Sequence, residues 1–183
     1  MAAGTDKEKR MKYLIVNTLP AADPAGAQAA AELSQRLGGA EAVHTDGMDI
    51  RGCCGCNACW LVTPGICAIK DDYERLFIKF LQADRVLFLA QTSKGFVSYK
   101  MKNLLDRILP LATMYLTFKN GQMRHYARYK KRTDMGLLFA GDEADPDLLR
   151  RWMERAMLNL HAKSLGVYKL EEREGLYHAL GCH

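Results

Sequence analysis

Residues 84–91 read DRVLFLAQ, and the five side chains from Val86 to Ala90 are all apolar. A strand with one face in water alternates apolar and polar residues, whereas a strand inside a parallel sheet is apolar on both faces. This stretch therefore predicts a central strand of a parallel sheet. It decides the fold class, because parallel strands are joined by crossover connections that are usually helical.

Strand and helix patterns alternate on the amino-terminal side of this stretch. Residues 12–17 (KYLIVN) and 41–45 (EAVHT) predict two strands. Between them, Asp23 is a candidate N-cap and Pro24 suits the first position of an alanine-rich helix. Directly before the central strand, the segment that starts at Asp71 has the pattern of a capping box, with Glu74 three residues later, and predicts another helix.

The same alternation continues toward the carboxyl end. The predicted elements are a helix over 98–109, a strand over 135–142, a helix over 145–165 and a strand over 166–170. Residues 111–134 show no clean period, and we expect them to form a long excursion of the kind that is often functional. We expect a disordered tail over 1–10 and one domain over 11–183.

Strands that alternate with helices predict a three-layer α/β/α architecture, with a doubly wound, parallel, five-stranded sheet. Ligands of such sheets bind beyond the carboxyl ends of the strands. We therefore expect the loops at 18–26, 91–97 and 141–145 to converge on the ligand. The cysteine-rich segment that follows the second strand should overlook the same crevice.

The bulk composition sets few limits. The 183 residues are 49% hydrophobic with a net charge of +5, and the apolar stretch near the amino terminus is too short to span a bilayer. We expect a cytoplasmic protein with no membrane and no nucleic-acid partner. The segment 124–132 (RHYARYKKR) interleaves aromatic and basic residues and could grip single-stranded nucleic acid, but a solvated loop that meets a partner subunit or the phosphate of NADPH is the favoured interpretation.

Residues 51–67 contain a dense group of thiols. Four of them have the spacing C-x2-C-x2-C-x7-C: Cys53, Cys56, Cys59 and Cys67. Two successive two-residue gaps bring three thiolates to one side of a tight turn, as a [4Fe–4S] cluster requires. A four-thiolate zinc site and unligated packing thiols remain alternatives. Cys54 does not fit the spacing, and Cys182 has no partner in sequence.

Three segments give the chain a resemblance to the iron-sulfur flavoprotein branch of the NADPH-dependent FMN reductase family. They are the first strand with its loop, the cysteine run that leads into IKDDY (69–73), and the segment AQTSKGFVSYKMKNLLDR (90–107). In the last segment Gly95, Ser98, Met101, Lys102, Asp106 and Arg107 are in register with the family pattern. The resemblance implies a flavodoxin-like fold with strand order 2-1-3-4-5, bound FMN, electron transfer, and assembly as a homodimer or homotetramer.

The resemblance and the predicted loops together give a set of cofactor-binding residues. The FMN phosphate is expected near Thr18, Ala25 and Gly26, and the ring near Gln91, Thr92, Ser93, Lys94, Gly95, Phe96, Gly141 and Asp142. No protein acid or base is expected at the reacting atoms, because the flavin carries the chemistry. The chain departs from the family pattern in its first loop, where Asp23 adds a negative charge and Pro20 and Pro24 remove two N–H donors. It departs again where residues 91–94 replace a proline followed by two aromatic residues.

These observations predict an FMN-dependent oxidoreductase or electron-transfer flavoprotein with a [4Fe–4S] cluster beside the flavin. NAD(P)H or a reduced carrier would be the electron donor, and a redox partner or a small molecule the acceptor. The alternative is a non-enzymatic binding or interaction protein of the same fold that has lost FMN and keeps a cysteine-bound metal. The altered first loop favours this alternative, whereas the cysteine run and residues 95–107 favour the flavoprotein.

Overall fold

The computed structural model describes residues 11–141 and 143–181. Its centre is a sheet of five parallel strands in the order β2-β1-β3-β7-β8. These strands are β1 (Tyr13–Asn17), β2 (Glu41–His44), β3 (Arg85–Ser93), β7 (Asp134–Ala140) and β8 (Ser164–Lys169). The predicted order 2-1-3-4-5 is confirmed, because β7 and β8 are the fourth and fifth of these strands along the chain. A short strand, β4 (Phe96–Val97), turns back and pairs antiparallel with the end of β3.

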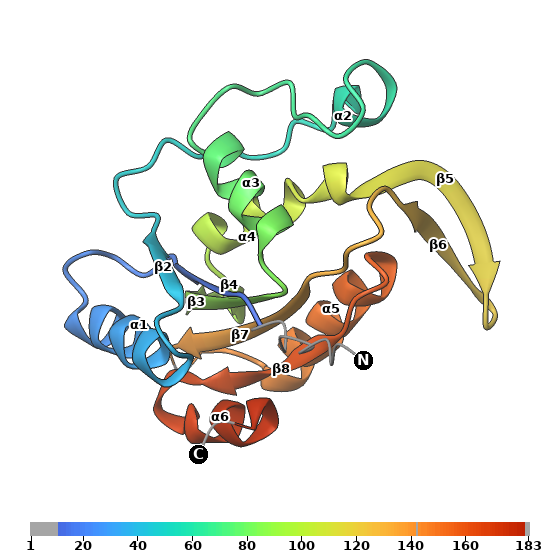
Figure 1. Cartoon of the computed structure of the whole chain (residues 1–183). Helices are drawn as coiled ribbons and strands as arrows, with labels where there is room; N and C mark the ends of the chain where they lie inside the picture. The colour runs from blue at the N-terminus through green and yellow to red at the C-terminus, as the bar shows by residue number, and fades with distance from the viewer. Residues whose placement is uncertain (1–10, 142, 182–183) are drawn as a thin grey trace, which may run out of the picture.

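Helices cover both faces of the sheet and complete the three predicted layers (Figure 1). One face carries α3 (Tyr73–Gln82), α4 (Tyr99–Asp106) and α5 (Pro146–Asn159), and the other carries α1 (Pro24–Arg36) and α6 (Glu174–Leu180). In β3, Val86 and Phe88 pack into the first core while Leu87 and Leu89 pack into the second. Successive side chains of a strand point to opposite faces, so the unbroken apolar run fills both cores.

The excursion after α4 contains an antiparallel hairpin, β5 (Ala112–Lys119) and β6 (Gln122–Ala127). Figure 1 shows it projecting from the body of the molecule. Its turn places Asn120 at φ 53° and Gly121 at φ 71°. An Asn-Gly pair with two positive φ angles is the preferred turn of a tight hairpin. The sequence interpretation overlooked this pair and therefore missed both strands.

Several helix boundaries differ from the predictions. The helix expected over 98–109 ends at Asp106, and a 3-10 turn, η1 (Leu109–Leu111), follows it; a second 3-10 turn is η2 (Leu170–Glu172). Only half of the predicted capping box forms: Oδ1 of Asp71 accepts from the N–H of Tyr73, where α3 begins, at 3.1 Å, but Glu74 pairs with Lys70 at 2.9 Å. A short helix, α2 (Ala58–Leu61), lies inside the cysteine-rich segment. Among the described residues, no helix has the length and apolar character needed to cross a membrane.

Candidate functional site

The structure brings most of the predicted cofactor-binding residues to one edge of the sheet. This is where the neighbouring strands β1, β3 and β7 end. The backbone N–H of Thr18 donates to the carbonyl of Leu89 at 2.8 Å, and the hydroxyl of Thr92 donates to the carbonyl of Ala140 at 3.1 Å. A Cβ atom on Gly141 would lie 2.6 Å from that hydroxyl oxygen. The loops therefore converge as predicted, but they are packed directly on one another. Asp142 and Cys182 lie outside the described residues, as does the tail expected over 1–10.

The loop between β1 and α1 uses its polar groups internally. Thr18 is buried, and its hydroxyl donates to the carbonyl of Leu89 at 2.9 Å. The N–H of Leu19 donates to Oδ1 of Asn17 at 3.0 Å, and the N–H of Ala21 donates to Oδ2 of Asp46 at 2.8 Å. These groups are the donors that would have to turn toward a bound phosphate. In this structure they already have acceptors from the protein.

The amino-terminal end of α1 is closed in the same way. Oδ1 of Asp23 accepts hydrogen bonds from the N–H groups of Ala25 at 3.0 Å and Gly26 at 3.4 Å. Leu19 fills the side of Gly26 that a side chain would occupy, because a Cβ atom there would lie 2.6 Å from a methyl carbon of Leu19. A helix end attracts anions through its free N–H groups. Here the carboxylate of Asp23 takes that place.

A second carboxylate, paired with a lysine, lies at this end of the sheet. Asp46 pairs with Lys100 at 2.6 Å, and this hydrogen bond, with that from Ala21, lowers the pKa of the Asp46 carboxyl. Asp46 is therefore ionised at neutral pH. A phosphate at the predicted position would meet the charge of Asp23 and the ion pair of Asp46 with Lys100, and it would find the donors occupied. The residues at this loop do not fit the FMN phosphate.

The residues predicted for the flavin ring form a tight turn between β3 and β4. Lys94 (φ 53°) and Gly95 (φ 81°) make the turn, and the side chains of Gln91, Ser93 and Lys94 are exposed. Phe96 points away from this edge and packs edge-on against Trp152 of α5, with ring centroids 4.9 Å apart. The exposed surface of the turn is therefore polar and carries one cation.

The cysteine-rich segment lies between β2 and α3. Residues 52–66 of it, which we call the Cys loop, contain four of the thiols, and Cys67 comes directly after them. Cys53, Cys54 and Cys56 are exposed, Cys59 is buried and Cys67 is half-buried; all five are reduced. Burial raises the pKa of the Cys59 thiol, and the charges of the other three predicted ligands raise it further. The other three predicted ligands therefore lie within electrostatic range of Cys59.

Two further observations bear on metal binding. The hydrogen bond from the N–H of Ala58, with a smaller effect of Cys54, lowers the pKa of the exposed Cys56 thiol. Within residues 11–141 and 143–181, no three ligand side chains are arranged closely enough to hold a metal ion. The donor set itself fits an iron–sulfur cluster, which takes four thiolates. Binding would require the exposed part of the Cys loop to fold toward Cys59.

A buried cation lies at the base of the Cys loop. Arg107 is 2% exposed, and its Nη2 lies 3.4 Å from the sulfur of Cys67. Its Nη1 is 2.5 Å from Oδ2 of Asp71. Burial is the largest effect on the Asp71 carboxyl and opposes its ionisation, but the hydrogen bonds from Arg107 and from the N–H groups of Arg51 and Tyr73, with the charge of Arg107, together outweigh it and lower its pKa. The sequence interpretation noted Arg107 as a family position and gave it no role. Its spacing of three residues from the buried Leu104 was the available sign that it faces the core.

The cations of the segment 124–132 are engaged within the protein. Arg128 donates to the carbonyls of Pro110 at 3.0 Å and Ala112 at 3.3 Å, and so fixes the base of the hairpin. Lys131 pairs with Asp84 at 3.2 Å. These two contacts anchor the segment to the rest of the chain. That the solvated loop meets a partner subunit or the phosphate of NADPH, rather than nucleic acid, stays a prediction.

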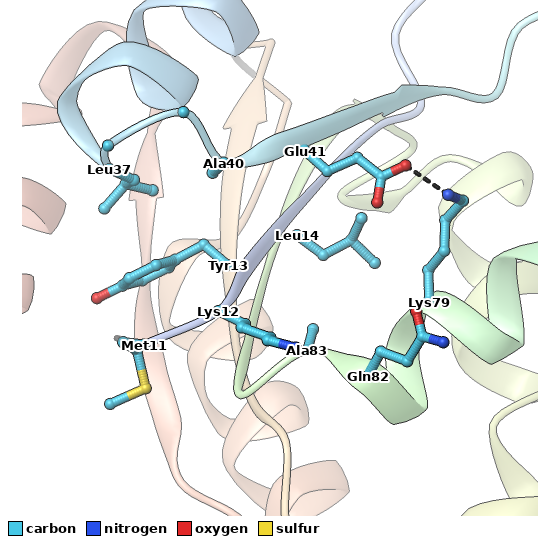
Figure 2. A pocket seen from close by; sticks show the side chains of 12 residues that line it. Met11, Lys12, Tyr13, Leu14, Leu37, Ala40, Glu41, Lys79, Gln82 and Ala83 are labelled. Atoms are coloured by element: carbon cyan, nitrogen blue, oxygen red, sulfur yellow. Dashed lines mark hydrogen bonds and ion pairs between the residues drawn. The ribbon is translucent and has the colours of Figure 1, made fainter. Parts of the chain in front are cut away.

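A cavity of about 330 Å³ lies at the opposite edge of the sheet, where β1 and β2 begin (Figure 2). Its lining includes Tyr13, Leu37 and the ion pair of Glu41 with Lys79, which Figure 2 shows across the opening. None of the residues that line it belongs to the predicted FMN or metal sets. It is therefore separate from the candidate site.

Comparisons with known proteins agree with the fold and include a partial match to an iron-sulfur flavoprotein. No family model matches the chain. A curated iron-sulfur flavoprotein from Archaeoglobus fulgidus is 37% identical over 78 residues, which are 42% of this chain and 37% of the relative. A flavone reductase structure aligns with a TM-score of 0.53 and 15% identity over 94% of this chain and 60% of its own. An FMN-dependent NADH-azoreductase from Bacillus anthracis, in complex with FMN, aligns with a TM-score of 0.53 and 10% identity over 92% of this chain and 93% of its own.

At these identities the two solved structures show the fold alone. The matched segment spans little more than a third of the curated relative, so the activity of that whole protein is not transferred by the match. The predicted resemblance is confirmed at this level: the chain has the flavodoxin-like fold of flavin-dependent reductases and is similar over part of its length to an iron-sulfur flavoprotein.

Proposed function

We propose that this protein is an oxidoreductase that moves electrons through a [4Fe–4S] cluster on its Cys loop. The observation that carries the proposal is the gathering of four thiols around one loop whose base holds a buried cation against Cys67. A cluster of this kind, when bound, accepts and releases single electrons. The reductase-like fold and the partial match to an iron-sulfur flavoprotein support the same class of activity.

The four proposed ligands have different tasks. Cys59 is buried and gives the site a fixed point, and Cys67 is held from below by Arg107. Cys53 and Cys56 are exposed, so they are free to move toward the other two. Each thiol must lose its proton to bind iron, so loading releases protons to solvent. Cys54 is left outside the ligand set by its spacing.

A second candidate function keeps FMN as the redox group, with NADPH or a reduced carrier as the electron donor. The names of the curated iron-sulfur flavoprotein and of the FMN-dependent azoreductase support it. Since the end of α1 is occupied by Asp23, the phosphate would need other donors in this case. The ring would lie near Thr92 to Phe96, where Gln91, Ser93 and Lys94 offer exposed polar groups.

We further propose that the protein assembles as a homodimer or homotetramer through the hairpin. An isolated two-stranded hairpin is marginally stable in water. Exposed apolar side chains lie along this one: Met114, Tyr115, Leu116, Phe118, Met123 and Tyr126. A second copy that covers them would stabilise the hairpin. The electron acceptor, a redox partner or a small molecule, and the cytoplasmic location stay predictions.

The deciding experiment measures iron and acid-labile sulfide in protein purified without oxygen or reconstituted. We expect about four of each per chain and broad visible absorption. Serine in place of Cys53, Cys56, Cys59 or Cys67 should remove most of the iron, whereas Cys54→Ser, the matched control, should keep it. Bound zinc without iron, or no metal at all, would refute the cluster and favour the non-enzymatic alternative. Titration with FMN on the same samples tests the second candidate, which fails if no flavin binds.

A further inference from the structure

Arg107, the residue that follows α4, is the largest of the fully buried side chains. A buried cation is costly unless a charge and several hydrogen bonds compensate it. Asp71 supplies the charge, and its side chain is 0% exposed. The ring of Tyr73 lies below the guanidinium, 4.4 Å from it, and adds a cation–π contact. Because burying a cation is energetically unfavourable, we expect Arg107 to have a role beyond packing.

The guanidinium joins both ends of the Cys loop. Nη1 donates to the carbonyl of Arg51 at 3.1 Å, directly before the loop. Nη2 donates to the carbonyl of Ile69 at 3.2 Å, shortly after it. Asp71 reinforces this closure, because its Oδ2 also accepts from the N–H of Arg51 at 3.0 Å. One side chain from a distant helix thus fixes where the chain enters and leaves the thiol-bearing segment.

The same guanidinium contacts one predicted ligand directly. Nη2 lies 3.4 Å from the sulfur of Cys67, within the range of a hydrogen bond to sulfur. Hydrogen bonds and positive charge at a ligand sulfur stabilise the reduced, more negative state of an iron–sulfur centre and so raise its reduction potential. Low accessibility strengthens the effect, because water screens a buried charge poorly.

We propose that Arg107 is a positioning residue that closes the base of the Cys loop, holds Cys67 as a ligand, and raises the reduction potential of the centre that the loop carries. The inference rests on the proposed function for the identity of that centre. A lysine would keep the charge but not the geometry, because only the planar fork of arginine reaches two carbonyls, a carboxylate and a sulfur together.

The neighbouring Arg51 provides a matched control. It is also next to Asp71, at 3.9 Å, but its side chain is 59% exposed, and its guanidinium donates a hydrogen bond to the carbonyl of Lys70 at 2.8 Å. A substitution of Asp71 should shift the reduction potential in the opposite direction to a substitution of Arg107. Asp71→Asn removes a negative charge beside Arg107 while an amide oxygen still accepts a hydrogen bond, so the potential should rise.

The first arm of the test uses reconstituted protein and a redox titration followed by electron paramagnetic resonance. We expect Arg107→Gln to weaken reduction about tenfold, a shift of about 59 mV to lower potential for one electron. Arg107→Lys should recover most of this shift, Asp71→Asn should move the potential upward, and Arg51→Gln should leave it unchanged. Equal potentials in all loaded variants would overturn the proposal. If Arg107→Gln does not fold, the other two variants test the proposal: Asp71→Asn should raise the reduction potential, and Arg107→Lys should lower it slightly.

The second arm uses metal-free protein and follows amide hydrogen exchange. Arg107→Lys should speed exchange across residues 51–69 at least tenfold, while exchange in the strands of the sheet stays unchanged. Unchanged exchange in the loop would overturn the closure of its base. Failure of the proposed function is visible separately, because the wild-type protein would then hold no iron. That result would overturn the inference about the potential, and the exchange experiment would still decide whether Arg107 closes the loop.

Discussion

The carboxylate of Asp46, at the end of β2, accepts a hydrogen bond from the N–H of Ala21 in the loop before α1, at 2.8 Å. With Asp23 on the end of the helix, it places two carboxylates, of which Asp46 is paired with Lys100, where flavodoxin-like proteins would hold a phosphate. The protein's own carboxylates therefore occupy the N–H donors that would otherwise bind an anion.

Opening that site should create or strengthen flavin binding. The double variant Asp23→Ser, Asp46→Asn removes both charges, and serine still caps α1. We expect FMN to bind at least tenfold more tightly than to the wild type, a gain of about 1.4 kcal/mol. Fluorescence quenching of free FMN measures this change. Asp49→Asn, which removes an exposed charge nearby, should have no effect, and equal affinity in the two proteins would contradict the prediction.

Assembly should depend on one face of the hairpin. Phe118 and Met123 are opposite each other across β5 and β6, and their exposed fractions are 74% and 60%. Replacing both with serine should lower the mass of the particle to that of one chain, as measured by light scattering after size exclusion. Ile78→Ser on α3, a residue that is 49% exposed, serves as the control. A wild-type protein that is already monomeric would refute the prediction.

Acid should weaken the contact between α1 and α6. Arg173 donates to Glu32 at 2.8 Å, and this hydrogen bond lowers the pKa of the Glu32 carboxyl against the opposing effect of burial. A carboxyl whose pKa is lower in the folded state stabilises the protein above its unfolded pKa, and this stabilisation is lost as the pH falls through the folded value.

Urea unfolding at pH 7 and at about pH 3 should therefore reveal the contribution. Glu32→Gln should lose about 1 kcal/mol or less relative to the wild type at pH 7, and the difference should shrink at the lower pH. Glu74→Gln, at the exposed pair with Lys70 near the start of α3, should show almost no loss at either pH. If the difference in free energy of unfolding between the wild type and Glu32→Gln grew on acidification, the prediction would be wrong.

The Cys loop should loosen when its hydrogen bond to η1 is cut. Nε1 of Trp60, in α2, donates to the carbonyl of Leu109 at 2.9 Å, and its ring lies 5.0 Å from that of His125 in β6. Trp60→Phe keeps an aromatic ring and removes the donor, so we expect a local loss of about 1 kcal/mol. Hydrogen exchange over residues 58–63 should rise several-fold, whereas Leu61→Ala at an exposed position should change it little.

The strands of the sheet could be predicted because each is a local apolar run, and their order followed from the resemblance. Short or unusual elements were harder: α6 covers seven residues near the end of the chain, and its pattern is too short to show a period. The hairpin was predictable in principle from Asn120 and Gly121. Its strands are exposed and contain several polar residues, so they lack the apolar run by which the strands of the sheet could be predicted.

The candidate site likewise has a part that could be predicted from the sequence and a part that could not. Cysteine spacing is a local property, and the four predicted ligands could be chosen from it. The closure of the first loop could be suspected from Asp23, but the contribution of Asp46 depends on a contact between residues 25 positions apart. The role of Arg107 depends on partners 36 to 56 positions away, and no local pattern in the sequence reports such contacts.

Arg107 holds the chain at Arg51 and Ile69 through backbone carbonyl groups, which every amino acid possesses. The segment between those points can therefore change in length and composition without losing its attachment. Protein engineers could treat it as a replaceable cassette, in which loops with other ligand spacings are grafted onto an unaltered scaffold.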